Sequence, residues 1–177
     1  MSEPLIVCLD VDYRTDTAVA AGLWFRGWTA AHEEAQAVAG FREVAGYEPG
    51  AFYRRELPCL LGVLREGPPA DIAIVDGYVS LEPGHPGLGA HLHDALDRKV
   101  PVVGVAKTAY RSASDVVEVL RGRSTSPLFV TAIGIDLATA ADEVRRMHGE
   151  HRVPTLLRAV DQLARRSEMP DRTRASD

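Results

Sequence analysis

The chain has 177 residues, of which 46% are hydrophobic, and its 20 basic and 25 acidic residues leave a formal net charge of −5. This length suits one compact domain, and the apolar share excludes a disordered chain. The acidic balance excludes a protein that coats nucleic acid through a broadly basic surface, although a local basic groove remains compatible with it.

The sequence contains no apolar run long enough to span a membrane, and Met1–Pro4 lack the pattern of a secretory signal. Its two cysteines, Cys8 and Cys59, lie in apolar segments and are expected to be buried free thiols. We therefore expect a cytoplasmic protein with no membrane partner, and a monomer is favoured.

The first half of the chain predicts three strands and a helix. Apolar segments without a helical period predict strands at 5–12, 18–25 and 36–44, and the short gaps between them favour an antiparallel meander. A stripe of apolar side chains predicts a helix over 52–65. Pro58 lies within it, which is tolerable only if the helix begins near residues 53–56 or kinks there.

The second half alternates helices with short buried strands. Strands are predicted at 71–76, 102–106 and 128–133, a Gly/Pro loop at 83–89, and helices at 91–99, 139–148 and 155–166. Three antiparallel strands followed by alternating helices and parallel strands predict an α/β fold with a mixed sheet flanked by helices. This order matches a ribonuclease H-like fold, and a generic doubly wound α/β domain is equally allowed. We expect one domain over 1–166 and a disordered tail over 167–177.

Three carboxylates stand where a metal site would form. Asp10 lies in the first apolar run, and a charge there is costly unless it is paired or bound to metal. Asp76 ends a buried strand, at the edge where open α/β sheets bind ligands, and Glu56 lies in the neighbouring helix. Hard cations such as Mg²⁺ take oxygen ligands of this kind. The alternative is that these acids cap strands or pair with nearby basic side chains, namely Arg54, Arg55 or Lys107.

Five segments of the chain resemble, in the same order, segments of the endonuclease V family, which nicks nucleic acid near deaminated adenine (inosine). They are Leu9–Tyr13, Tyr47-x-Pro49-Gly50-x5-Glu56, Val75–Gly77, Gly104–Lys107 and Ser126–Val130. The tyrosine-to-glutamate segment and the Gly-Val-Ala-Lys segment are the most specific of the five. Together the five segments cover most of residues 5–165.

The resemblance implies roles for individual residues. Asp10, Glu56 and Asp76 would bind Mg²⁺ or Mn²⁺, Lys107 would contact the phosphate near the scissile bond, and Tyr47 would be the wedge that fills the gap left by a displaced base. Further positions match those that line the pocket for the lesion base: Pro49, Gly50, Phe52, Gly77 and Gly89, with His85 matching a histidine of the family's His-Pro pair. His93 matches a further histidine of the family about one helical turn later, Asp161 matches an Asp or His that approaches the metal site from the C-terminal helix, and Asp12 shares a strand face with Asp10.

The chain also departs from the family pattern. The family's helix before the first strand has no counterpart ahead of Asp10, the segment between Lys107 and Pro127 is short, and the later Gly-His is Gly134-Ile135. A local basic groove remains possible because several basic residues lie in the middle of the chain: Arg54, Arg55, Lys99, Lys107, Arg111, Arg121 and Arg123.

The resemblance implies a metal-dependent endonuclease that cuts the second phosphodiester 3′ of an inosine-type lesion in DNA or RNA. The alternatives are a nuclease with another nucleic-acid substrate, and a trimmed homologue that binds nucleic acid or a protein without cutting. The acidic balance and the missing helix favour the alternatives, whereas the complete set of acids favours the endonuclease.

Overall fold

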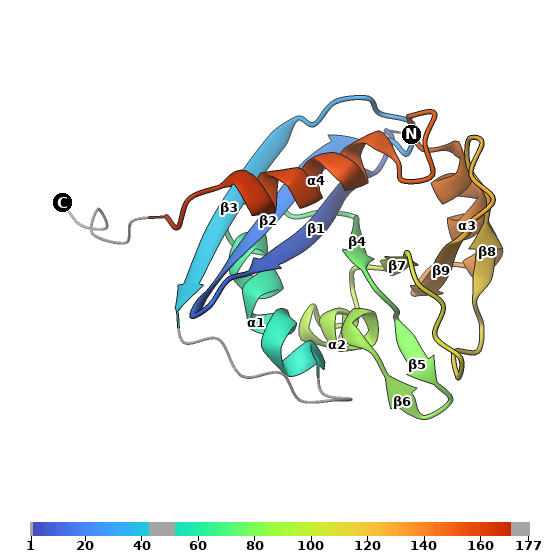
Figure 1. Cartoon of the computed structure of the whole chain (residues 1–177), viewed down its shortest axis with the longest axis horizontal. Coiled ribbons are helices and arrows are strands. Elements are labelled where there is room, and N and C mark those ends of the chain that lie inside the picture. Colours follow the sequence, from blue (N-terminus) through green and yellow to red (C-terminus); the bar gives the residue numbers. More distant parts are fainter. Residues whose placement is uncertain (1, 43–51, 171–177) are drawn as a thin grey trace.

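The computed structural model describes residues 2–42 and 52–170. The described chain forms a seven-stranded sheet with helices on both faces and a separate two-stranded sheet (Figure 1). The strands are β1 (Leu5–Tyr13), β2 (Thr17–Arg26), β3 (Ala35–Arg42), β4 (Ile72–Asp76), β5 (Ser80–Glu82), β6 (His85–Pro86), β7 (Val102–Ala106), β8 (Val117–Val119) and β9 (Leu128–Ile133). The helices are α1 (Phe52–Leu64), α2 (Leu88–Ala95), α3 (Leu137–Arg146) and α4 (Thr155–Arg166). Among these described helices, none has the length and apolar character needed to cross a membrane.

The strand order of the large sheet is β3-β2-β1-β4-β7-β9-β8. The predicted antiparallel meander is confirmed, because β1 pairs antiparallel with β2, and β2 with β3. Both β4 and β7 run parallel to β1, which places the carboxyl ends of three adjacent strands at one edge of the sheet. Strand β9 then returns antiparallel beside β7 and carries the short β8 on its outer side.

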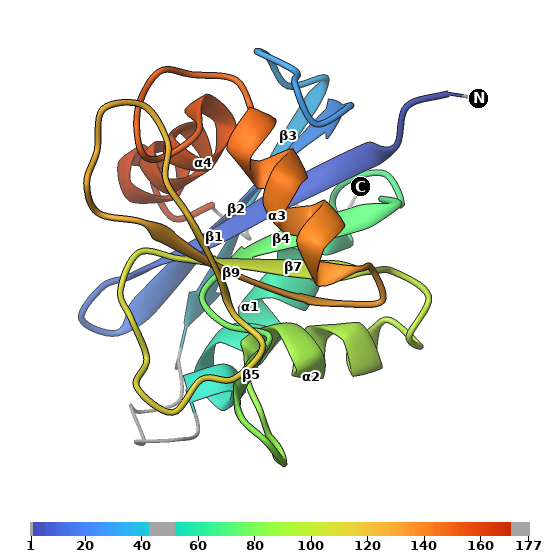
Figure 2. The same cartoon turned by 90° about the vertical axis from the view of Figure 1, so that its right-hand side faces the viewer.

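Alternating side chains of the strands supply two separate cores. On one face, Ile6 and Cys8 of β1 pack in a cluster with Val160 of α4 and residues of α3. On the other face, Val7 and Leu9 pack in a cluster with residues of α1 and α2. Figure 2 shows α3 and α4 on one side of the sheet and α1 and α2 on the other. A side chain at the carboxyl edge of β1 therefore lies between two helical layers.

The helix predicted at 91–99 was wrong at both of its ends, for local reasons. Helix α2 begins at Leu88, inside the predicted Gly/Pro loop, after the extended Gly87. The same helix ends at Ala95 because Asp97 and Arg98 both adopt positive φ, at 57° and 58°, which a helix cannot continue through. In α1 the helix begins at Phe52 and continues through Pro58.

Candidate active site

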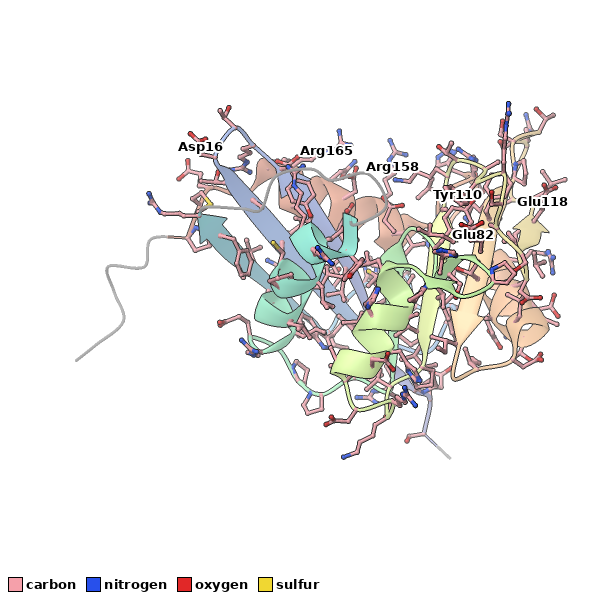
Figure 3. All side chains as sticks on the ribbon, turned by 90° about the horizontal axis from the view of Figure 1, so that it is seen from below. Asp16, Glu82, Tyr110, Glu118, Arg158 and Arg165 are labelled. Carbon is pink, nitrogen blue, oxygen red and sulfur yellow. The ribbon has the colours of Figure 1, made fainter. Side chains whose placement is uncertain are left out.

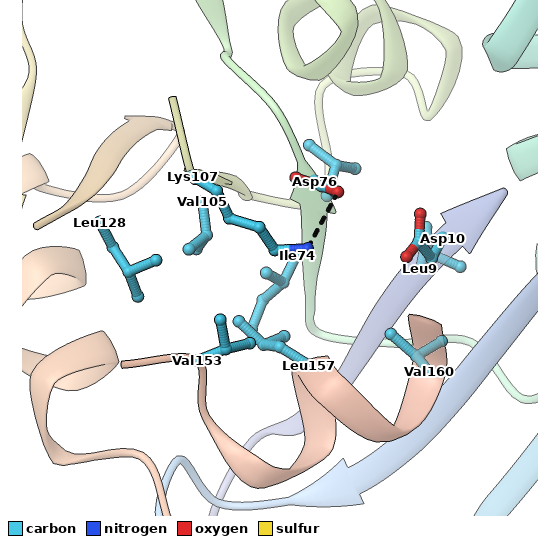
Figure 4. Close-up of a pocket in the computed structure, with 11 residues that line it drawn as sticks. Leu9, Asp10, Ile74, Asp76, Val105, Lys107, Leu128, Val153, Leu157 and Val160 are labelled. Carbon is cyan, nitrogen blue, oxygen red and sulfur yellow. Dashed lines mark ion pairs between the residues drawn. The ribbon is translucent and has the colours of Figure 1, made fainter. Parts of the chain in front are cut away.

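Asp10 and Asp76 lie on adjacent parallel strands at the carboxyl edge of the sheet. The last paired residues of β1 and β4 are Leu9 and Val75, so the two aspartates stand one step further along each strand. Residues at matching positions of parallel strands project to the same face. Figure 4 shows both aspartates among the residues that line one cavity, with Asp10 across from Asp76.

Lys107 directly follows β7 and lies at the same edge of the sheet. Val105 pairs with Asp76, and Lys107 follows two residues later, so the alternation of the strand returns the lysine to the same side. Its Nζ lies 3.6 Å from Asp76 Oδ2 (Figure 4). The ion pair that the sequence allowed as an alternative role for Asp76 is therefore present, and its cation is the lysine predicted to contact phosphate.

Glu56 reaches the site from α1, the helix on the opposite face of the sheet from α4. Its residue is only 5% exposed, and Oε2 has no hydrogen-bond partner among the described residues. Burial, followed by repulsion from Asp10 and Asp76, raises the pKa of Glu56 to about 8, and the nearby Arg55 offsets this in part. Because the charges of the two aspartates act on Glu56, we infer that the three acids converge at the strand ends.

The neighbouring carboxylates also affect the pKa of Asp10. Burial, followed by the charge of Asp76, raises the pKa of Asp10 to about 7. Asp161 of α4 adds to the increase through its charge and through a side-chain hydrogen bond with Asp10. A fourth carboxylate therefore lies beside Asp10, as the match of Asp161 to a position near the family's metal site suggested, although it also pairs with Arg165 at 3.0 Å.

An apolar cavity lies beneath these carboxylates. It contains about 350 Å³ of unfilled space, part of it open solvent. Asp10, Asp76 and Lys107 stand at its mouth, and apolar side chains from the sheet and from α4 form its walls, namely Leu9, Ile74, Val105, Leu128, Leu157 and Val160. Apolar walls keep the dielectric low around the buried acids, whereas solvent screens the pair of Asp76 and Lys107, whose side chains are 43% and 41% exposed.

The donor set suits a hard divalent cation, although its side chains are not arranged as a closed coordination shell. Across 2–42 and 52–170, no three His, Cys, Asp or Glu side chains already stand in metal-binding geometry. The chemistry is nevertheless that of a cation site, because Glu56 Oε2 is buried without a partner and two carboxylates carry raised pKa values. A cation between them would offset both the burial and the mutual repulsion.

The predicted base pocket is only partly covered by the described residues. Tyr47, Pro49 and Gly50 lie outside them, and Phe52 is described only as the first residue of α1. Gly77 has φ of +132°, a conformation that side chains rarely adopt, and an added Cβ would point into open space. Its role in the pocket remains a prediction that its conformation and position beside Asp76 support.

Other predicted site residues have ordinary structural contacts. Gly89 is buried, and an added Cβ would lie 2.7 Å from Val79 Cγ2, so close packing explains this glycine. His85 lies on exposed β6, 3.4 Å from a carboxylate oxygen of Glu82. His93 is buried, with Nδ1 2.8 Å from the carbonyl oxygen of Val100. These contacts leave the predicted roles of Gly89 and His85 in base binding untested.

Asp12 belongs to a different interaction from Asp10. It pairs with Arg14 at 3.2 Å, and Arg14 also donates to the carbonyl oxygen of Ser167 beyond the end of α4. This contact ties the β1–β2 hairpin to the helix that carries Asp161. Asp12 therefore has a structural partner, although it lies one strand period from Asp10.

The turn after Asp76 is fixed by contacts that the sequence analysis did not identify. The backbone N–H of Val79 donates to Thr131 Oγ1 at 2.9 Å. An added Cβ on Gly104 would lie 2.5 Å from the carbonyl oxygen of Gly77, so only glycine allows β7 to pass this close to the turn. The hydroxyl of Tyr78 donates to the carbonyl oxygen of Thr108 at 2.6 Å, which holds the segment after Lys107.

Two arginines bind backbone carbonyls beside the site. Arg121 is 5% exposed and donates to the carbonyl oxygens of Met147, Gly149 (3.1 Å) and His151 (2.7 Å). Arg152 donates to the carbonyl oxygens of three residues, namely Lys107 at 2.5 Å, Pro127 at 2.8 Å and Ser126 at 3.0 Å. Arg121 therefore does not contribute to a basic surface, and sequence pattern cannot reveal partners that are backbone atoms.

Comparisons with known proteins place this geometry in one family. The family model for Endonuclease V matches residues 2–162. An Endonuclease V of Nocardia farcinica is 31% identical over 140 residues, which are 67% of this chain and 61% of that protein. The chain thus spans about three-fifths of the length of this relative.

Solved structures agree in fold. The Endonuclease V of Streptomyces avermitilis superposes with a TM-score of 0.77 at 26% identity, over 93% of this chain and 81% of that one. Human ENDOV superposes with a TM-score of 0.75 at 22% identity, over 92% of this chain and 83% of that one. The Endonuclease V of Ciona intestinalis, in complex with DNA containing an inosine followed by a ribo-adenosine, gives 0.74 at 16% identity, over 92% and 85%. The fold is ribonuclease H-like, and the chain belongs to the endonuclease V family of nucleases.

Proposed function

We propose that this protein is a divalent-metal-dependent endonuclease that hydrolyses a phosphodiester near inosine in nucleic acid, at the second bond 3′ of the lesion. The observation that carries the proposal is that Asp10 and Asp76 line one cavity and that the buried Glu56 lies near enough for their charges to raise its pKa. The Ciona intestinalis relative bound to inosine-containing DNA supports inosine as the base recognised.

Asp10, Glu56 and Asp76 are the residues that would hold Mg²⁺ or Mn²⁺. Such an ion lowers the pKa of bound water and stabilises charge on the phosphate oxygens. The acids bring oxygen donors from β1, β4 and α1 toward one edge of the sheet, and Asp161 interacts with Asp10 from α4. Glu56 Oε2, which lacks a protein partner among the described residues, is the donor left available for the ion.

Lys107 supplies positive charge at the scissile phosphate. Its Nζ lies 3.6 Å from Asp76 Oδ2 and its side chain is 41% exposed, so it can reach a phosphate oxygen while staying beside the acids. Water attacks phosphorus, the bond from phosphorus to the 3′ oxygen breaks, and the products carry a 3′-hydroxyl and a 5′-phosphate. The extra negative charge of the transition state lies beside Lys107, which stabilises it.

The test is a cleavage assay with Mn²⁺ on four oligonucleotides: DNA and RNA, each with and without a single inosine. The proposal expects cleavage of an inosine strand at the second bond 3′ of the lesion, with DNA repair or processing of inosine-containing RNA in the cytoplasm as the corresponding role. Equal cleavage of plain strands would indicate a nuclease with another substrate. If the protein binds both inosine strands but cuts neither, it is a module that binds without cutting, and the proposal is overturned.

A further inference from the structure

Two neighbouring hollows lie between the candidate active site and the loop that precedes α4. The first is lined by Lys107, His151, Arg152, Val153, Arg158 and Asp161, with about 920 Å³ of unfilled space that includes open solvent. The second is lined by residues of two facing loops, among them Arg123, Ser124, Gly149 and Glu150. His151 and Arg152 line both hollows, so the two adjoin. We call the two together the basic trough.

The charge of the basic trough is positive, against the acidic balance of the chain. Its lining contains four Lys or Arg side chains, namely Lys107, Arg123, Arg152 and Arg158, and two carboxylates, Glu150 and Asp161. Asp161 is already paired with Arg165. The trough therefore presents more positive charge than its own acids neutralise.

Arg123 and Arg158 are the cations of the trough that remain available for a ligand. Both are exposed, and neither forms an ion pair with a carboxylate of the described residues, whereas several exposed arginines elsewhere do so. Arg98, Arg145 and Arg146, for example, each pair with an acid of their own helix region. Figure 3 shows Arg158 at the surface of the molecule, where its guanidinium is open to solvent.

Hydrogen bonds from two arginines to backbone carbonyl oxygens fix the walls of the trough. Arg121 binds carbonyl oxygens of the loop that forms one wall, including those of Gly149 and His151. Arg152 binds the carbonyl oxygens of Pro127 and Lys107, which connects the trough to the strand end in the active site. Figure 2 shows the β8–β9 connection beside the loop that leads into α4. A trough with fixed walls loses little conformational entropy when it binds a ligand.

We propose that the basic trough binds the phosphodiester backbone of the substrate strand on one flank of the scissile bond, with Arg158 and Arg123 contacting phosphates. This inference rests on the proposed function, because the trough begins at Lys107. Guanidinium groups match phosphate geometry through paired hydrogen bonds. DNA and RNA share this backbone chemistry, so the trough does not distinguish them.

The test compares two double variants that remove the same charge. R123Q/R158Q empties the trough of its free cations. R65Q/K99Q is the matched control, because Arg65 and Lys99 are also exposed but precede β4 and β7, at the opposite ends of these strands from Asp76 and Lys107. Both double variants are made in the wild-type protein for cleavage assays and in the D76N protein for binding assays. A melting temperature close to that of the parent protein establishes that each variant is folded.

Binding is measured by fluorescence anisotropy with single-stranded inosine oligonucleotides, as DNA and as RNA, over a series of salt concentrations. For a single strand, the logarithm of the binding constant falls with the logarithm of the salt concentration, with a slope of about 0.7 per phosphate neutralised. We expect R123Q/R158Q to bind roughly tenfold more weakly and to reduce the salt slope by about 1.4. The control should keep the parent's slope. An unchanged slope in R123Q/R158Q would overturn the trough while leaving the proposed function standing.

Cleavage and competition give independent readouts. In R123Q/R158Q the KM for an inosine strand should rise about tenfold with kcat within twofold, and lengthening the strand on one flank of inosine should no longer strengthen binding. Polyglutamate that competes as well as an oligonucleotide of equal length would assign the trough to acidic protein segments and overturn the proposal. A wild-type chain that binds the strands but cuts none overturns only the proposed function, and one that binds none overturns both.

Discussion

The imidazole ring of His91 lies on the phenol ring of Tyr53, with centroids 3.6 Å apart and planes inclined by 16°. Tyr53 stands in the first turn of α1, three residues before Glu56, and His91 stands in the first turn of α2, two residues after Gly89. The stack therefore joins the helix that presents a predicted metal ligand to the helix that follows the predicted base pocket. Burial lowers the pKa of His91, which favours the neutral ring.

His91→Ala should loosen this contact, whereas His91→Phe should preserve it. Aromatic pairs contribute about 0.5–1.5 kcal/mol beyond their buried area, so the alanine variant should lose roughly 1 kcal/mol or more in urea unfolding and the phenylalanine variant less. If the stack also positions α1, kcat/KM on an inosine strand should fall in H91A and recover in H91F. Equal stability of the two variants would contradict the role of the stack.

Asp76→Asn should abolish both cleavage and stabilisation by metal. The substitution removes one negative donor from the proposed site while keeping the size of the side chain. Wild type should show a melting temperature that rises with Mn²⁺ concentration, because the ion binds the folded state. Asp16→Asn is the control, since Asp16 is exposed in the β1–β2 turn. A melting temperature of wild type that millimolar Mn²⁺ leaves unchanged would count against a metal site.

The stability of the metal-free protein should fall as the pH rises. Folded pKa values of about 7 for Asp10 and about 8 for Glu56 exceed the ordinary carboxyl values of about 4. The folded state therefore binds protons more tightly than the unfolded state, and this contribution is present at about pH 4 and is lost as the pH passes through about 7 to 8. Thermal melts in chelator should show a fall of several degrees between about pH 5 and pH 8.

The Glu56→Gln variant distinguishes the contribution of Glu56 to this pH dependence from that of Asp10. It should flatten the upper part of the pH dependence and raise the melting temperature at pH 8 above that of wild type in chelator, because the buried charge is absent. Mn²⁺ should reverse the order of the two proteins by stabilising wild type alone. A metal-free wild type whose stability increases steadily from about pH 5 to pH 8 would be inconsistent with crowded carboxylates.

Arg121→Lys should destabilise the protein strongly despite keeping the charge. The guanidinium binds the carbonyl oxygens of Met147, Gly149 and His151, and a lysine cannot span them with the same planar geometry. Leaving buried carbonyls unpaired costs about 1–3 kcal/mol each in the worst case, so a total loss of roughly 3 kcal/mol is expected in urea unfolding. Arg123→Lys, two residues along and exposed, is the control and should change stability by less than about 0.5 kcal/mol.

Tyr47→Ala should weaken discrimination for inosine more than it weakens metal binding. Stacking of an aromatic ring on a base contributes roughly 1–3 kcal/mol, which corresponds to about one to two decades in affinity. Stabilisation by Mn²⁺ should survive, because Tyr47 supplies no ligand. If Tyr47 is instead part of the core, the variant would melt at lower temperature and keep its ratio of inosine to plain cleavage, and the wedge role would be wrong.

The sequence predicts the parts of the fold where local pattern and packing agree. Helix α4 has the predicted bounds, 155–166, because its apolar face and its polar face alternate at a regular helical period. The strand that carries Asp10 extends one residue beyond its predicted end, at Tyr13. The hairpin of β5 and β6 was missed because strands of three and two residues are too short for an alternating pattern.

The candidate site is predictable only in its acids and its lysine. A carboxylate at the end of an apolar strand is a local signal, which is why Asp10 and Asp76 stand out. The carbonyl partners of Arg121 and the stack of Tyr53 on His91 depend on segments distant in sequence, and no local pattern contains them. Glu56 is an intermediate case, because its helix is local but its convergence with the strand ends is tertiary.

The chain order of the acidic cluster bears on when the enzyme could first act during synthesis. Asp10 belongs to the first strand and Asp161 to the last helix, and α4 packs directly on β1 and β2. A nascent chain still held in the ribosome lacks α4 on its sheet, so Asp10 has neither the cover of that helix nor the neighbouring carboxylate. The complete set of acids therefore assembles only after α4 has emerged and packed on the sheet.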